Sequence, residues 1–197
     1  MWRALGCTEG DDALFDRLVA AWSEPQRHYH TLQHLRECLA LLDDVRAQAV
    51  HPAEVELALW FHDAVYEPAR HDNEERSADW AREAMQAAGV ADAAAQRVHA
   101  LVMDTCHAQP PCGADAQLLV DIDLSILGAP AQRFDESDAQ IRREYAHVDE
   151  DDWRRGRARV LRGFLERPAI YTTPGFHAAR EAQARANLQR ALERLQA

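Results

Sequence analysis

The chain contains no lysine, and all 22 of its basic residues are arginine. With 33 acidic residues, the formal net charge is −11. A protein that binds duplex nucleic acid needs a basic face, so this shortage of positive charge argues against that class. A small phosphorylated substrate stays open, because a bound metal ion can supply positive charge locally.

Cysteine is scarce and long apolar runs are missing. Four cysteines without a CxxC pair predict free thiols rather than a disulfide framework. No apolar run approaches the roughly 20 residues of a membrane-spanning helix. The first residues also lack the apolar segment of a signal peptide. We therefore expect a cytoplasmic protein that does not contact membranes.

Alternating strand patterns are almost absent, and the apolar residues recur at helical spacing nearly throughout. Leu14, Leu18 and Trp22, for example, fall on one predicted helix face. We see no linker and no repeat, so the 197 residues predict an all-α, single-domain bundle of about eight to ten helices. A last helix over about 174–196 is expected to pack on it. The longest loops are expected at 67–72 and 108–114.

The segment RHYHTLQHLREC, residues 27–38, holds three histidines. His30 and His34 are four residues apart, which would place them on one helix face where both could contact one ion. Alternatively, one binds the ion and the other acts on the substrate. A histidine-rich helix start on the surface would explain the same segment without any metal.

A His-Asp pair, His62-Asp63, follows the apolar run LALWF. Adjacent residues on a helix point about 100° apart, so both reach one object only if it lies between them, and a metal ion satisfies this condition. A second copy, His71-Asp72, lies in a polar stretch. There Asp72 is interpreted as a helix N-cap, with Glu75 completing a capping-box-like pair. We therefore interpret the first copy as chemical and the second as structural.

Two carboxylates, Asp121 and Asp123, lie inside the apolar stretch VDIDLSILG at residues 120–128. Burying a carboxylate costs several kcal/mol unless it is paired or binds a metal. A metal ligand is therefore one interpretation. A helix cap or an arginine pair is the other, and it applies more to Asp121 than to Asp123.

Taken together, the order H…HD…D resembles the HD superfamily of metal-dependent phosphohydrolases over about residues 12–165. YHTLQHLREC is similar to the paired-histidine segment of the cyclic-nucleotide phosphodiesterases, and IDLSILG is similar to their Ala-Asp-Leu-Ser segment. FHDAVYEP, DNEERSA and IRREYAHV resemble a bacterial branch of predicted HD phosphohydrolases whose substrate is uncharacterised. The resemblance implies one HD-type domain over residues 1–197.

The same resemblance implies a ligand set and a general acid. It makes His30 the acid, and it names four metal ligands: His34, His62, Asp63 and Asp123. The phosphodiesterases carry another histidine three residues after the His-Asp pair, where this chain has Tyr66. Small nucleotidases of the superfamily place a catalytic glutamate nearby, and Glu67 is one residue off that position.

Further residues are candidates for supporting roles. Glu67 or Glu74 could orient the attacking water, and Arg143 or its neighbour Arg142 could hold phosphate oxygens. His107, expected at a helix end beside a loop, is the best candidate for contacting a second metal or the phosphate. Asp121 is a further candidate for that contact.

Two imidazoles and two carboxylates suit a divalent transition metal better than Mg²⁺, which leaves Mn, Fe, Co, Zn or Ni, and a second ion is open. The expected reaction is hydrolysis of a phosphoester or phosphoanhydride of a small molecule, with a nucleotide suggested by analogy. The alternatives are an HD-type di-iron oxygenase and a non-catalytic metal- or nucleotide-binding module. A homodimer is open too, because the last helix has an apolar stripe that suits either its own core or a second subunit.

Overall fold

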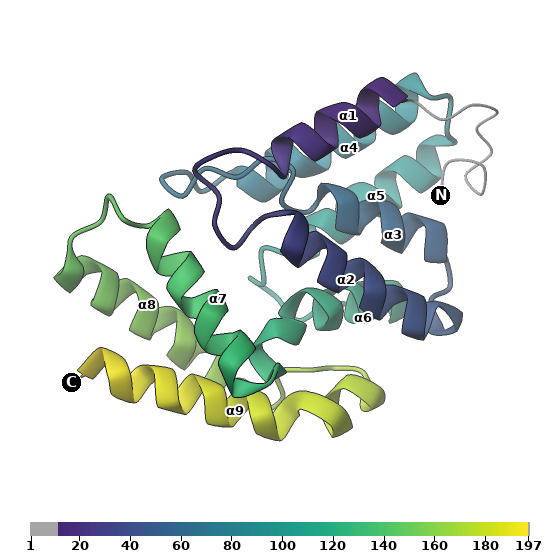
Figure 1. The fold of residues 1–197 in the computed structure, drawn as a ribbon. Helices are drawn as coiled ribbons and strands as arrows, with labels where there is room; N and C mark the ends of the chain where they lie inside the picture. The colour runs from purple at the N-terminus through teal and green to yellow at the C-terminus, as the bar shows by residue number, and fades with distance from the viewer. Residues whose placement is uncertain (1–11, 197) are drawn as a thin grey trace. The chain divides into compact units, whose positions relative to one another are not determined.

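The computed structural model describes residues 12–196, which form nine α-helices and two short 3₁₀ helices with no strand among them (Figure 1). This confirms the all-α prediction and the expected number of helices. No helix in this part of the chain combines the length and apolarity needed to cross a membrane.

Contacts divide the chain into two compact units, Met1–Asp123 and Leu124–Ala197. The expectation of one domain stays a prediction. The elements of the first unit are α1 (Asp12–Ala21), α2 (Leu32–Val45), η2 (Arg46–Gln48), α3 (Pro52–Phe61), α4 (Asn73–Ala87), α5 (Asp92–Asp104) and α6 (Ala114–Asp123).

Helix α3 forms the core of the first unit and packs against α2, α4, α5 and α6. Its sequence, PAEVELALWF, is apolar on nearly every side, as expected of a helix surrounded by others. Of its two glutamates, Glu54 is buried, but it receives two hydrogen bonds of 2.6 and 2.8 Å from Arg97 of α5. The C-terminal end of α3, which His62 and Asp63 follow, is therefore firmly placed.

The predicted face of α1 is buried and backs onto this end of α3. Leu14, Leu18 and Trp22 are each less than 5% exposed. The indole nitrogen of Trp22 donates to the Trp60 carbonyl at 2.9 Å, and its ring lies 5.4 Å from the His62 ring. The side chain of Trp22, the residue that follows α1, thus forms an apolar wall behind His62.

The second unit comprises η3 (Leu124–Gly128), α7 (Ala131–Glu144), α8 (Glu150–Leu165) and α9 (Pro174–Gln196). Helix α9 packs on η3 and α8. The fully buried amide of Asn187 donates to the carbonyls of Leu127 and Ala129, at 2.8 and 2.9 Å. The Tyr171 hydroxyl accepts from the Gly128 amide and donates to the Leu124 carbonyl, both at 2.9 Å. These bonds hold the turn at η3.

We expect Gly128→Ala to destabilise the second unit by roughly 1–3 kcal/mol, the usual cost of overpacking. A Cβ at this position would lie 2.7 Å from Arg180 Cβ and 2.9 Å from the Tyr171 hydroxyl, so the contacts that hold η3 must shift. Urea unfolding followed by circular dichroism measures the change. Gly163→Ala in α8 is the matched control, because its Cβ meets no atom within 4 Å and alanine favours a helix. Equal stability of the two variants would contradict the prediction.

Candidate metal centre

His34 lies in the first turn of α2, but His30 lies before that helix. The helix begins at Leu32, and its N-cap Thr31 accepts a hydrogen bond from the Gln33 amide. The prediction that His30 and His34 share one helix face is therefore wrong, because the cap stops the helix between them. Their rings are nevertheless near each other, with centroids 6.2 Å apart.

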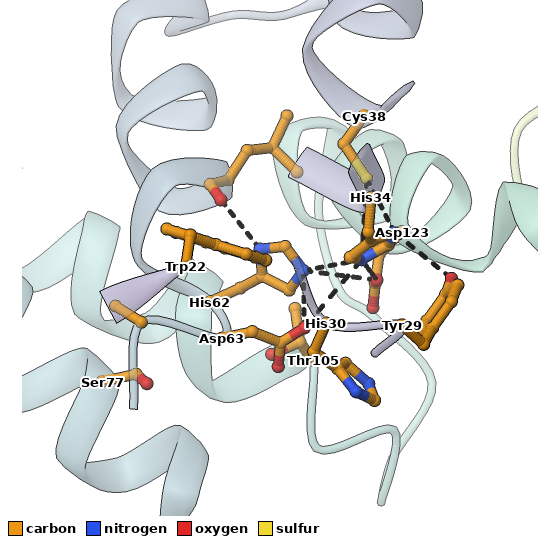
Figure 2. Close-up of polar contacts among 12 residues, drawn as sticks. Trp22, Tyr29, His30, His34, Cys38, His62, Asp63, Ser77, Thr105 and Asp123 are labelled. Atoms are coloured by element: carbon orange, nitrogen blue, oxygen red, sulfur yellow. Dashed lines mark hydrogen bonds and ion pairs between the residues drawn. The ribbon is translucent and has the colours of Figure 1, made fainter. Parts of the chain in front are cut away.

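The other predicted ligands come from the ends of two further helices. His62 is the C-cap of α3, Asp63 follows it in a turn, and Asp123 is the last residue of α6. Figure 2 shows the rings of His34 and His62 turned toward each other and toward both carboxylates. Donor atoms of three residues lie within 4.8 Å of one another and could hold a metal ion: His34, His62 and Asp123.

The distances between these side chains suit shared coordination. The Nε2 atoms of His34 and His62 are 3.1 Å apart, and Asp123 Oδ1 is 3.2 Å from the first and 3.5 Å from the second. Asp63 Oδ2 lies 3.1 Å from His62 Nε2 and 3.9 Å from His34 Nε2. Zinc–nitrogen and zinc–oxygen bonds are about 2.0–2.2 Å long, so atoms bound to one such ion lie roughly 3–4 Å apart. The group therefore fits one divalent ion.

Each imidazole is also held from its far side. His62 Nδ1 lies 2.8 Å from the Leu59 carbonyl, so Nδ1 carries the proton and Nε2 presents its lone pair to the cluster. His34 Nδ1 lies 3.2 Å from the Tyr29 hydroxyl, and the Cys38 sulfur is 3.7 Å away. Both histidines are almost completely buried. The two donor nitrogens are thus fixed in direction.

The electrostatics favour ionised carboxylates. Burial would raise the pKa of Asp123, but hydrogen bonds with His107, His34 and His62 outweigh it and hold the pKa well below its ordinary value. Burial also opposes ionisation of Asp63, but the charges of His62 and His30 lower its pKa. Burial would lower the pKa of His62, but the charge of Asp63 raises it well above its usual value. Both carboxylates therefore favour the ionised form, in which they can bind a cation.

His107 is brought to the centre by its backbone. It lies three residues beyond the end of α5 and has φ 54°, in the left-handed region that is costly for a residue with a Cβ. Its Nε2 lies 3.1 Å from Asp123 Oδ2, on the carboxylate oxygen that does not face His34 and His62. The histidine expected to contact a second metal or a phosphate is thus next to the cluster.

Two further sequence candidates of the first unit do not join the cluster. Asp121 is fully buried on α6, but residues i and i+2 of a helix point about 200° apart, so it does not share a face with Asp123. Glu67 is exposed and paired with Arg76 at 3.0 Å. Arg143 is exposed near the end of α7, in the second unit.

Glu74 is half-buried in the first turn of α4. Burial, and then the charge of Glu74, raise the pKa of the thiol of Cys106, the residue that precedes His107. Of the two glutamates considered for orienting water, Glu74 is half-buried and Glu67 is exposed.

The second His-Asp copy lies away from the cluster. Asp72 is at the N-cap position of α4 but makes no capping hydrogen bond, because its carboxylate binds Arg70 instead. The expected capping box is thus not formed at Asp72. His71 is exposed in the preceding bend.

Two residues of the 27–38 segment matter more than the sequence indicated. Arg27 is buried, and its guanidinium donates to the carbonyls of Asp63, Ala64 and His30 at 2.5, 3.0 and 3.3 Å. Tyr29 is the partner of His34 described above. Their position inside the histidine cluster was the only signal that could have found them.

The fold and the cluster define an all-α protein with a candidate His/Asp metal centre. A scan against models of protein families, a search of curated proteins and a search of solved structures each found no match to this chain.

Proposed function

We propose that this chain is a metal-dependent phosphohydrolase of the HD superfamily, which cleaves a phosphoester or phosphoanhydride of a small molecule such as a nucleotide. The single observation that carries the proposal is the meeting of His34, His62-Asp63 and Asp123, from three separate parts of the chain, within coordination distance. In the H…HD…D pattern of the superfamily, the metal ligands stand at these positions.

The donor set also supports the class of metal. Two imidazole nitrogens and two carboxylate oxygens suit Mn²⁺, Fe²⁺, Co²⁺, Zn²⁺ or Ni²⁺. His34, His62, Asp63 and Asp123 would hold the ion, and a bound divalent ion lowers the pKa of water and polarises a phosphoryl oxygen. His107, whose Nε2 lies 3.1 Å from Asp123 Oδ2, would contact a second ion or the phosphate itself.

The neighbouring side chains of the first unit would handle protons and water. His30 is half-buried, with its ring stacked on Tyr66 at 4.0 Å between centroids, and its charge acts on Asp63. From this place it would donate a proton to the leaving oxygen. Glu74 would orient the attacking water. The wall formed by Trp22 keeps bulk water from the far side of His62.

The test uses the two His-Asp copies as matched variants. We expect wild type and His71→Ala to bind one divalent ion per chain and to release phosphate from a nucleotide panel with Mn²⁺. His62→Ala and Asp63→Ala should lose both properties. Metal analysis after dialysis, phosphate release and circular dichroism measure ion content, activity and folding.

Other outcomes separate the competing functions. Two irons per chain would indicate an oxygen-dependent enzyme instead of a hydrolase. A folded wild type that binds no ion under any loading would refute the metal centre. A wild type that binds an ion but hydrolyses no member of the panel would instead favour a binding module.

A further inference from the structure

We propose that Tyr29 is a positioning residue, which fixes the tautomer and direction of His34 for metal binding. This inference rests on the metal centre of the proposed function but not on the reaction that the centre catalyses. It assigns a role to a side chain outside the H…HD…D pattern.

The geometry of the pair carries the proposal. Tyr29 is 5% exposed, and its hydroxyl oxygen lies 3.2 Å from His34 Nδ1 (Figure 2). The two rings lie 4.9 Å apart at an interplanar angle of 34°. The opposite nitrogen of the same ring, Nε2, faces His62 and Asp123. Tyr29 therefore touches the one atom of His34 that decides which nitrogen can bind an ion.

Imidazole chemistry gives this contact its direction. A neutral imidazole carries one proton, and the nitrogen without it is the metal ligand. For His34 Nε2 to bind an ion, Nδ1 must carry the proton and donate it to the Tyr29 oxygen. The neighbouring Cys38 sulfur is a weaker acceptor at 3.7 Å and cannot replace the hydroxyl.

The two histidines differ in how easily this support can be removed. His62 Nδ1 donates to a main-chain carbonyl, that of Leu59, which no side-chain substitution deletes. His34 depends on the hydroxyl of a side chain. Removing that hydroxyl while keeping the ring therefore isolates the effect of orientation on metal affinity.

The experiment compares Tyr29→Phe with wild type in binding of Co²⁺ to metal-free protein, by calorimetry and by the visible absorption of the bound ion. We expect an affinity about 10- to 100-fold weaker, the usual loss when the partner of a ligating histidine is removed. The absorption spectrum should also change, because the His34 ring is no longer held in one orientation.

Tyr171→Phe is the matched control, because Tyr171 is a buried tyrosine of the second unit whose hydroxyl bonds to Gly128 and Leu124 of η3. It should lower the unfolding temperature and leave Co²⁺ affinity and spectrum unchanged. Wild-type affinity and spectrum in Tyr29→Phe would overturn the inference. If wild type itself binds no Co²⁺, both the metal centre and the role of Tyr29 are refuted. This result differs from one in which wild type and Tyr29→Phe bind Co²⁺ equally well, which refutes the role of Tyr29 alone.

Discussion

Replacing Asp123 with asparagine is expected to weaken divalent-ion binding by more than about 100-fold, beyond the 10- to 100-fold loss typical when the partner of a ligand is changed. Asp123 contacts three imidazoles, with Oδ1 near His34 and His62 and Oδ2 near His107. Asparagine keeps the shape of the side chain. It removes the negative charge and places an amide group where one carboxylate oxygen was.

The physical reason is the balance of charge in a buried site. The hydrogen bonds that His107, His34 and His62 make with Asp123 hold its pKa well below the ordinary value, against the effect of burial. Asp123 therefore favours its ionised form. Without that anion, a divalent ion would bind in a nearly buried site with only Asp63 to neutralise it, and the desolvation of the ion would be poorly compensated.

Asp121→Asn supplies the control, because Asp121 lies two residues earlier on α6 and is more deeply buried. It should leave ion affinity within a few-fold of wild type, whatever it does to stability. Calorimetric titration with Mn²⁺ or Co²⁺ measures both variants, and circular dichroism checks that each is folded. Near-wild-type affinity in Asp123→Asn would remove this residue from the metal centre.

Arg27→Ala is expected to lower the free energy of unfolding by at least about 3 kcal/mol, the range seen when one member of a buried charged network is deleted. The Arg27 side chain is 0% exposed and pairs with Glu24 at 2.9 Å. Its three main-chain acceptors lie in two separate segments, at His30 and at Asp63 and Ala64. The substitution would leave these carbonyls without their donor.

The same substitution should weaken metal binding, because Arg27 ties the turn that carries Asp63 to the segment that carries His30. Arg27→Lys should recover only part of the stability. Lysine keeps the charge, but its ammonium is a single point and cannot reproduce the planar fork that spans several carbonyls.

Urea unfolding and calorimetric titration test these two effects. The exposed Arg159 of α8 offers a control, since Arg159→Ala should change stability by no more than about 0.5 kcal/mol. An unfolding free energy for Arg27→Ala within that same margin of wild type would show that the buried guanidinium does not tie the two segments together.

The sequence alone was sufficient for the fold class. Apolar residues at helical spacing predict helices because a helix must bury one stripe, and Leu14, Leu18 and Trp22 are buried as that rule requires. The candidate ligands could also be named early, because a carboxylate within an apolar run needs a partner. That argument selected Asp121 together with Asp123, and it favoured the cap or arginine pair more for Asp121 than for Asp123.

Only the tertiary structure decided which side chains meet. Asp121 and Asp123 differ by their angle around α6, and the packing of that helix determines which one faces His34 and His62. His107 reaches Asp123 through a left-handed backbone conformation that no spacing rule predicts.

The same holds for the supports of the centre, Arg27 and Tyr29. Arg27 bonds to the Asp63 carbonyl, 36 residues away, so packing decides that contact. Tyr29 is only five residues before His34, but the turn that precedes α2 decides that its hydroxyl meets His34 Nδ1. Local spacing determines secondary structure because the interactions that stabilise a helix act between residues that are neighbours in the chain. The directions of the donor atoms, and hence the chemistry of the centre, depend on how helices formed in this way pack together.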